Sequence, residues 1–199
     1  MFKAFCDFET EPPFVWTLIE SLTLTNAQKT MYRKNFAANI PLGECNTTWG
    51  LFRLPERNMQ AILSSYGSTH YRATCNFNAE VGIGLDNRRD YVRFAKCRHA
   101  TALTSGHTST CTSIVDYINV RGHACRQCRV PFTGGSSQHI HIDLTRASTF
   151  CTTQSHFAVP DRITNEDVFG NYLNPNPLFS CAANENSTTN WWIGGVYLE

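Results

Sequence analysis

Nine cysteines constrain the fold of this chain more than any other feature of its sequence. A cytosolic protein of 199 residues seldom carries so many thiols, so we expect an oxidising compartment and a framework of disulfide bonds. The cysteines are spread along the whole chain, unlike the close clusters that hold metals: Cys6, Cys45, Cys75, Cys97, Cys111, Cys125, Cys128, Cys151 and Cys181. Because nine is odd, at least one thiol stays free or bonds another chain, and pairing the other eight allows about 105 connectivities.

Two more features favour a secreted, extracellular protein. Charged residues make up only 17% of the chain, against about 25% in typical soluble domains. Asn46 and Asn186 each begin an Asn-x-Ser/Thr triplet, the acceptor for N-glycosylation. No signal-peptide pattern follows Met1, so we expect a mature or truncated form of the secreted protein.

The charge balance and the apolar stretches exclude two classes of partner. Seventeen basic and sixteen acidic residues give a net charge of +1, which is too small a field to attract nucleic acid or an anionic membrane. The longest apolar stretches, such as residues 14–19, reach about a third of the length that a bilayer span requires. We therefore expect no nucleic-acid partner and no membrane insertion.

Hydrophobic periodicity predicts a β-rich chain with short helices. Period-two alternation predicts strands over residues 14–24, 69–77, 112–120 and 138–144. An apolar stripe, with Pro55 in the first turn and Gly67 at the end, predicts a helix over residues 54–66. A second short helix is predicted over residues 26–35.

Two segments carry more specific structural expectations. In 69–77 the alternation places Tyr71 and Cys75 on one face and Arg72 on the other, so we expect a half-buried strand. From Cys151 to the end, frequent Pro, Gly and Asn predict a long irregular region held by disulfides. Ordered loops of that length commonly carry function.

Two histidines in the 138–144 segment form a metal-type pattern. On a strand, His139 and His141 point to the same side, with Cα atoms about 6.5–7 Å apart. With a third histidine they can hold zinc, and zinc with an open position would make the chain a hydrolase. The alternative is a polar strand face on which both histidines are solvated or hydrogen-bonded.

Cys125 and Cys128 have the Cys-x-x-Cys spacing of thiol oxidoreductases. No βαβ pattern surrounds them, and seven further cysteines favour a structural role in the disulfide framework. A zinc knuckle with His139 and His141 is a third alternative.

Four residues near the C-terminus have the chemistry that sugar binding requires. Trp191 and Trp192 offer aromatic faces to the apolar side of a sugar ring, and Asn184 and Asn190 offer amides to its hydroxyls. The alternative is that one tryptophan caps the core while the other covers a disulfide.

A short acidic loop predicts a calcium site, and calcium is the only cofactor that we expect. Asp161, Asn165, Glu166 and Asp167 bring oxygen ligands together, although the strict alternation and the glycine of an EF-hand are missing. The alternative is a solvated turn. No nucleophile elbow, HExxH motif, catalytic Cys–His signature or phosphate-binding glycine loop occurs, so we expect no enzymatic activity.

Both ends of the chain resemble fibrinogen-related C-terminal domains. Residues 5–10 (FCDFET) and 16–21 (WTLIES) are similar to the start of those domains, and Cys151, residues 165–167, Cys181 and Trp191–Trp192 resemble their distal region. Residues 68–77, 117–125 and 187–192 are similar to a set of secreted invertebrate fibrinogen-like proteins. The chain departs from the family at residues 11–15 (EPPFV), where the family has a glycine-rich turn, and at Gly194–Gly195, where it has Cys and His.

The resemblance implies an α+β fold: a fibrinogen-like domain with a twisted, mostly antiparallel sheet, short helices and a loop-rich, disulfide-stapled C-terminal lobe. We expect one domain over residues 1–199, with an N-terminal subregion (1–50), a central sheet (51–150) and a distal lobe (151–199).

Three functions follow from these patterns. The first is a non-enzymatic, lectin-like recognition module that binds glycans, acetylated groups or extracellular glycoproteins through the loops after Cys151. The second is a structural glycoprotein of a matrix or filament, which self-associates through the odd cysteine or a strand edge. The third is the zinc-dependent hydrolase built on His139 and His141.

Overall fold

The structure is a computed structural model. It describes residues 2–43, 46–79, 90–98, 113–130, 140–141, 167–170 and 172–196. Its strands are β1 (Cys6–Asp7), β2 (Phe14–Thr23), β3 (Leu51–Arg53), β4 (His70–Cys75), β5 (Tyr91–Ala95), β6 (Ser113–Val120), β7 (His123–Val130), β8 (Ile140–His141), β9 (Val168–Phe169) and β10 (Thr188–Val196). Its helices are α1 (Leu24–Ala27) and α2 (Glu56–Ser64), with short 3-10 turns η1 (Phe77–Ala79), η3 (Lys96–Arg98) and η4 (Ser180–Ala182).

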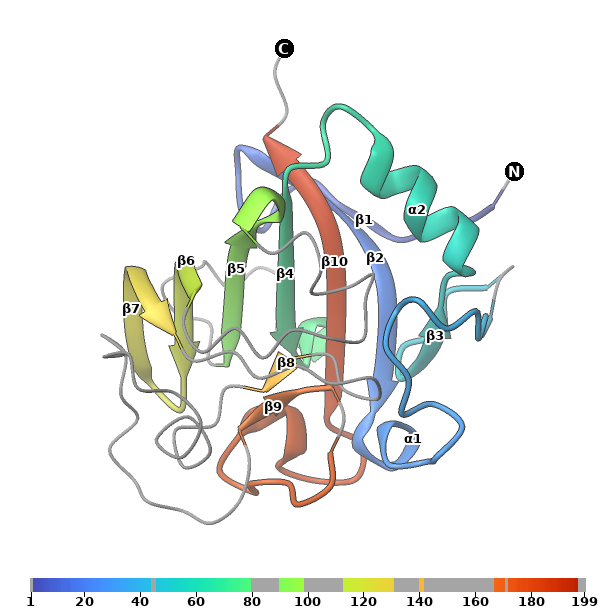
Figure 1. The fold of residues 1–199 in the computed structure, drawn as a ribbon. Helices are drawn as coiled ribbons and strands as arrows, with labels where there is room; N and C mark the ends of the chain where they lie inside the picture. Colours follow the sequence, from blue (N-terminus) through green and yellow to red (C-terminus); the bar gives the residue numbers. More distant parts are fainter. Residues whose placement is uncertain are drawn as a thin grey trace.

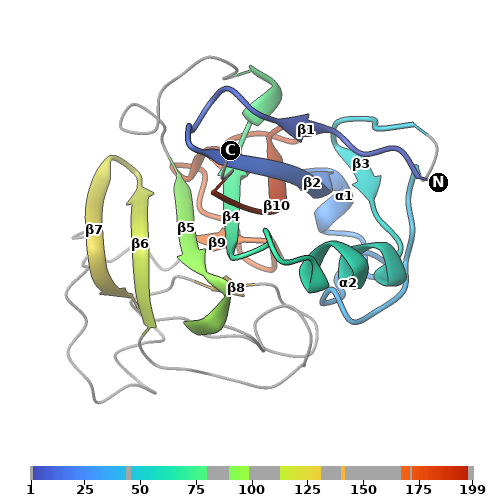
Figure 2. The same cartoon turned by 90° about the horizontal axis from the view of Figure 1, so that it is seen from above.

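One antiparallel sheet of eight strands dominates the fold (Figure 1). The strand order is β1-β2-β10-β4-β5-β6-β7, with β3 paired to β2 beside β1. Strand β10 therefore lies in the middle of the sheet, where it pairs with β2 on one side and with β4 on the other. Helix α2 lies at the β2–β3 end, and β6 and β7 form the opposite end (Figure 2). Strands β8 and β9 make a separate two-stranded sheet.

The sheet-rich architecture with few helices agrees with the coarse α+β class. The strands predicted at 14–24, 69–77 and 112–120 correspond to β2, β4 and β6, and β8 covers the described part of 138–144. The described helices are too short to cross a bilayer.

The two predicted helices had different outcomes. Helix α2 confirms the expectation for residues 54–66 and buries Met59 and Leu63, but Pro55 and Ser65 are its caps, so neither Pro55 in the first turn nor Gly67 as terminator was right. The helix predicted at 26–35 is wrong. Only Asn26 and Ala27 of that segment are α-helical, as the last two residues of α1, whose N-terminus is capped by the Thr23 hydroxyl, which accepts a hydrogen bond from the Asn26 amide.

Strand β10 corrects the expectation of an irregular region from Cys151 to the C-terminus. Its nine residues form the longest pairing of the sheet, along β2, and eight of them are buried. A strand that is covered on both faces needs no alternation of polar and apolar residues, so its sequence lacks the period-two signal.

Strand β4 is buried on both faces, which corrects the half-buried expectation. Its polar face holds the Arg72 side chain, which is 0% exposed. The guanidinium donates to Asp7, the last residue of β1, at 2.6 Å and to Glu11, in the turn between β1 and β2, at 3.4 Å. It also lies 4.3 Å from the ring centre of Trp192 and 4.8 Å from that of Trp16. Ion pairs and aromatic rings therefore cover the charge that the sequence pattern assigned to solvent.

Glu11 and Asp7 are held in place by further partners. Glu11 accepts a hydrogen bond from the Tyr91 hydroxyl at 2.5 Å and pairs with Arg93. Burial opposes the ionisation of Asp7, but Arg72 and the hydrogen bonds from Thr10 outweigh it and lower the pKa of Asp7. The N-terminal turn is thus attached to β4 and β5 by charge as well as by packing.

Removing the central cation should cost much of the stability. In Arg72→Met, the carboxylates of Asp7 and Glu11 stay buried without Arg72, and we expect a loss of about 3–5 kcal/mol of unfolding free energy. Lys3→Met is the control, since it removes a positive charge from an exposed side chain near the N-terminus, and it should change stability by less than about 0.5 kcal/mol. Urea unfolding with the disulfides intact measures both. Equal effects of the two substitutions would contradict this account of Arg72.

Candidate functional site

The two tryptophans that were expected to form a sugar platform lie in the core. Trp191 and Trp192 are each 0% exposed. The ring of Trp191 packs against Phe36 and Phe94, whereas that of Trp192 packs against Phe77, and its Nε1 donates to Thr74 at 3.1 Å. Neither ring offers a face to a ligand, because both serve as packing between the sheet and its covering segments.

The two asparagines of the same prediction are far from equivalent. Asn190 is fully buried in β10, where its amide accepts from Ser21 at 2.7 Å and donates to Thr188 at 3.2 Å. Asn184 is exposed in the turn before β10, and its side-chain oxygen accepts from the Asn186 amide. The structure therefore does not bring the four predicted sugar-binding residues together on one surface.

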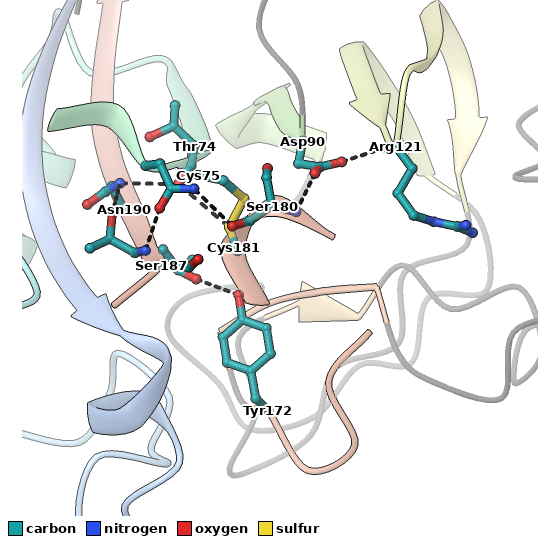
Figure 3. Close-up of a disulfide and its surroundings, with 12 residues drawn as sticks. Thr74, Cys75, Asp90, Arg121, Tyr172, Ser180, Cys181, Ser187 and Asn190 are labelled. Carbon is teal, nitrogen blue, oxygen red and sulfur yellow. Dashed lines mark hydrogen bonds between the residues drawn. A yellow bond between two sulfur atoms is a disulfide. The ribbon is translucent and has the colours of Figure 1, made fainter. Parts of the chain in front are cut away.

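The segment before β10 is fastened to the sheet by a disulfide and two polar side chains (Figure 3). Cys75, the last residue of β4, is bonded to Cys181 in η4. Asn76 donates to the Ser180 carbonyl at 2.9 Å, and Asp90 accepts from the Ser180 amide at 2.6 Å. Asp90 also accepts from the Arg121 amide at 2.5 Å, so it links this segment to the turn between β6 and β7.

Asp167 is the one predicted calcium ligand that the structure describes. One carboxylate oxygen accepts from Arg121 at 3.2 Å and the other from Asn176 at 2.9 Å. Burial raises the pKa of Asp167 to about 6, although Arg121 and Asn176 favour the carboxylate. Asp161, Asn165 and Glu166 lie outside the described residues. The cation beside Asp167 in the structure is the guanidinium of Arg121, and the calcium site stays a prediction.

The zinc hypothesis also rests mainly on undescribed residues. His139 lies outside the described chain, and only the backbone of His141 is described, in β8 opposite Val168. Within the described ranges, no three His, Cys, Asp or Glu side chains form a metal-binding group.

The described cysteines confirm the expectation of disulfide bonds. Besides Cys75–Cys181, Cys125 is bonded to Cys128 within β7. Cys6 and Cys97 are exposed free thiols. Cys45, Cys111 and Cys151 lie outside the described residues.

The two disulfides differ in how much of the chain they close. Cys75 and Cys181 are 106 residues apart, whereas Cys125 and Cys128 are 3 apart. Chain entropy assigns about 5 kcal/mol of stabilisation to the long loop and about 2 kcal/mol to the short one. The Cys125–Cys128 disulfide is therefore the less important of the two for the fold. It lies in a strand, without the helix N-terminus of an oxidoreductase.

Both glycosylation triplets begin at exposed residues. Asn46 follows the turn at Gly43, and Asn186 lies in the turn before β10. Their exposure is compatible with the predicted modification of both side chains.

An open groove of about 480 Å³ lies between helix α2 and the ends of β2 and β10. We call it the α2–β10 groove. Its walls are apolar and hydroxyl side chains and glycine backbone, with one aromatic ring and no charged residue among them: Phe2, Val15, Thr17, Ala61, Ile62, Ser65, Gly67, Ser68, Ile193, Gly194, Gly195 and Val196. Its volume is within the range of small-molecule sites, about 300–1,000 Å³.

Two adjacent glycines make the floor of the groove possible. A Cβ on Gly195 would lie 1.9 Å from the Gly67 carbonyl oxygen, and one on Gly194 would lie 2.1 Å from the Val15 carbonyl oxygen. Only glycine therefore lets β10 pass this closely between the loop after α2 and strand β2. The sequence shows the pair Gly194–Gly195 but not its neighbours, because Val15 and Gly67 are distant in the chain.

The groove can accept a neutral ligand with both apolar and polar groups. Val15, Ile62 and Val196 offer apolar contact, and the hydroxyls of Thr17 and Ser65 offer hydrogen bonds. The lining contains no carboxylate, imidazole or thiol that could act as a general base or nucleophile. Sequence analysis missed this site because its lining has no motif.

No protein family, curated protein or solved structure matches this chain.

The raised pKa of Asp167 predicts a pH-dependent contribution to stability. The folded state binds the Asp167 proton more tightly than the unfolded chain does, because the pKa of this carboxyl is near 3.8 in the unfolded chain. The stabilisation of the folded state by this proton is therefore fully present below pH 3.8. It is lost as the pH rises through about 6. The variant Asp167→Asn does not titrate at this position. Between roughly pH 4 and pH 7.5, we expect wild type to lose on the order of 3 kcal/mol relative to the variant. Urea unfolding across this range measures the difference, and parallel pH profiles would contradict the burial of the carboxylate.

Proposed function

We propose that this protein is a secreted, non-enzymatic recognition domain of the fibrinogen-like type, which binds neutral glycans or acetylated groups in the α2–β10 groove. The uncharged groove carries the proposal, because its size suits a small ligand and its lining combines aliphatic walls with hydroxyl groups. The disulfides and the exposed sequons support an extracellular location.

Acetylated sugars match the lining in three respects. Their methyl group and the apolar side of the ring fit the aliphatic side chains of Val15, Ile62 and Val196. Their hydroxyl and amide groups can exchange hydrogen bonds with the side chains of Thr17 and Ser65. A neutral ligand also loses less solvation energy than a charged one on entering a site that offers no counter-charge.

A substitution on α2 tests the site without disturbing the core. Ala61 is exposed and lines the groove, so Ala61→Trp should fill it and reduce binding on a glycan array at least about tenfold. Ser64→Trp is the matched control, since Ser64 is exposed on the same helix but does not line the groove. Circular dichroism should show both variants folded.

Two results would contradict the groove as the binding site. One is glycan binding that Ala61→Trp and Ser64→Trp leave equally strong. The other is the absence of binding by wild type to acetylated or other neutral glycans at any density on the array.

The second candidate function is covalent self-assembly into a matrix or filament, and the free thiols favour it. The two described disulfides use four of the nine cysteines, which leaves five. Five thiols cannot all pair within the chain, and both described ones among them, Cys6 and Cys97, are exposed. An exposed thiol in an oxidising compartment readily bonds another molecule.

Self-assembly predicts disulfide-linked species in air. We expect native, unreduced protein to form covalent dimers or larger species that a reductant returns to the 22.5 kDa chain. Mass measurement before and after reduction tests this, with thiol-blocked protein as control. A monomer that persists in air with an unblocked thiol would count against this second function.

A further inference from the structure

We propose that the Cys125–Cys128 disulfide accepts the free thiol of a second copy of this chain, so that copies become linked by disulfide exchange at strand β7. The proposal rests on the second candidate function, covalent self-assembly, and names the site at which it occurs.

The Cys125–Cys128 disulfide lies at one end of the main sheet. Strand β7 is the last in the strand order and pairs only with β6 among the described strands. The Cys125 side chain is half-buried and its neighbours Ala124, Arg126 and Gln127 are exposed, whereas Cys128 is 4% exposed. An incoming thiolate therefore reaches the sulfur of Cys125, and Cys128 is the leaving group.

The other described disulfide is closed to such attack. Cys75 is 1% exposed and Cys181 is 0% exposed. It also closes the longer loop and holds the segment before β10 to β4. Opening Cys125–Cys128 leaves that attachment intact, and β7 remains paired with β6 at seven positions.

The attacking group is one of the exposed thiols. Cys6 lies in β1, at the opposite end of the sheet from β7, and Cys97 lies in η3 after β5. Neither thiol is part of β7, so a bond from either to Cys125 of another copy is a head-to-tail contact. Such contacts repeat from copy to copy and generate chains or rings.

The exchange needs no external oxidant. The thiol of Cys6 or Cys97 loses its proton to water, and the thiolate attacks the Cys125 sulfur of the second copy. A new sulfur–sulfur bond forms to Cys125 while the Cys125–Cys128 bond breaks, and its electron pair leaves on Cys128. The Cys128 thiolate then takes a proton from water. One disulfide and one thiol are present before and after each linkage.

Exchange leaves the total number of free thiols unchanged, and this gives a specific test. Unreduced protein is incubated without oxygen, with a metal chelator, near pH 8, and is quenched by alkylation. We expect dimers that increase with protein concentration, a constant total of thiols, and cross-linked peptides that join Cys125 to Cys6 or Cys97. Peptide mass spectrometry identifies the link in wild type, so this result does not depend on a variant that folds.

Four variants sharpen the test. The double variant Cys125→Ser, Cys128→Ser should reduce the yield of anaerobic dimers on the order of tenfold. Of the single variants Cys6→Ser and Cys97→Ser, the one that removes the attacking thiol should have the same effect. Gln127→Asn is the matched control, because it changes the residue between the two cysteines, which has a φ of 48°, but keeps the disulfide. Its dimer yield should equal that of wild type.

Three outcomes would overturn the proposal. Dimers that form only in air, joined through thiols other than Cys125, would exclude exchange and leave self-assembly standing. Anaerobic dimers that do not contain Cys125 would also exclude it. No covalent species under either condition would overturn both exchange and self-assembly.

Discussion

A buried guanidinium holds the centre of this structure together. Arg72 extends from β4 between the rings of Trp192 and Trp16 and reaches the carboxylates of Asp7 and Glu11. Each group is costly to bury alone, so the turn before β2 stays in place only when its acids meet this cation. The second buried pair, Arg53–Glu20, serves the outer side of β2 in the same way: Arg53 donates to the carbonyls of residues 34, 35 and 38 and holds that loop against β3.

Sequence patterns predicted the elements in which polar and apolar residues recur with a regular period. Strands β2, β4 and β6 and helix α2 were found from their periodicity, and the coarse class followed from them. Strand β10 was missed because its sequence carries no alternation of polar and apolar residues. Arg72 was assigned to solvent because an alternating pattern does not show that acids 61 and 65 residues away will cover it. The groove could not be predicted, since Val15, Gly67 and Gly195 meet only after the sheet has formed.

The residues with the most distinctive side-chain chemistry lie in the interior of the protein. Trp191, Trp192, Arg72 and its partners Asp7 and Glu11 are all buried. The described surface features are plainer: an uncharged groove beside α2 and the exposed thiols of Cys6 and Cys97. This is why the sugar-binding residues predicted from the sequence include Trp191 and Trp192, which lie in the core. The sites proposed for recognition and for assembly lie in different regions: the groove is beside α2, and Cys125–Cys128 is in β7, at the far end of the sheet from α2 (Figure 2).

The position of β10 has a consequence for biosynthesis. Strands β2 and β4 are translated long before β10, yet β10 is the strand that lies between them. Strands β2 and β4 thus lack the strand that joins them while the intervening chain emerges from the ribosome. Cys75 can form its disulfide only after Cys181, more than a hundred residues later in the chain, has been synthesised. Long-range pairing of this kind slows folding and prolongs the exposure of unpaired strands. During that interval the early strands stay unpaired and Cys75 stays without its disulfide partner.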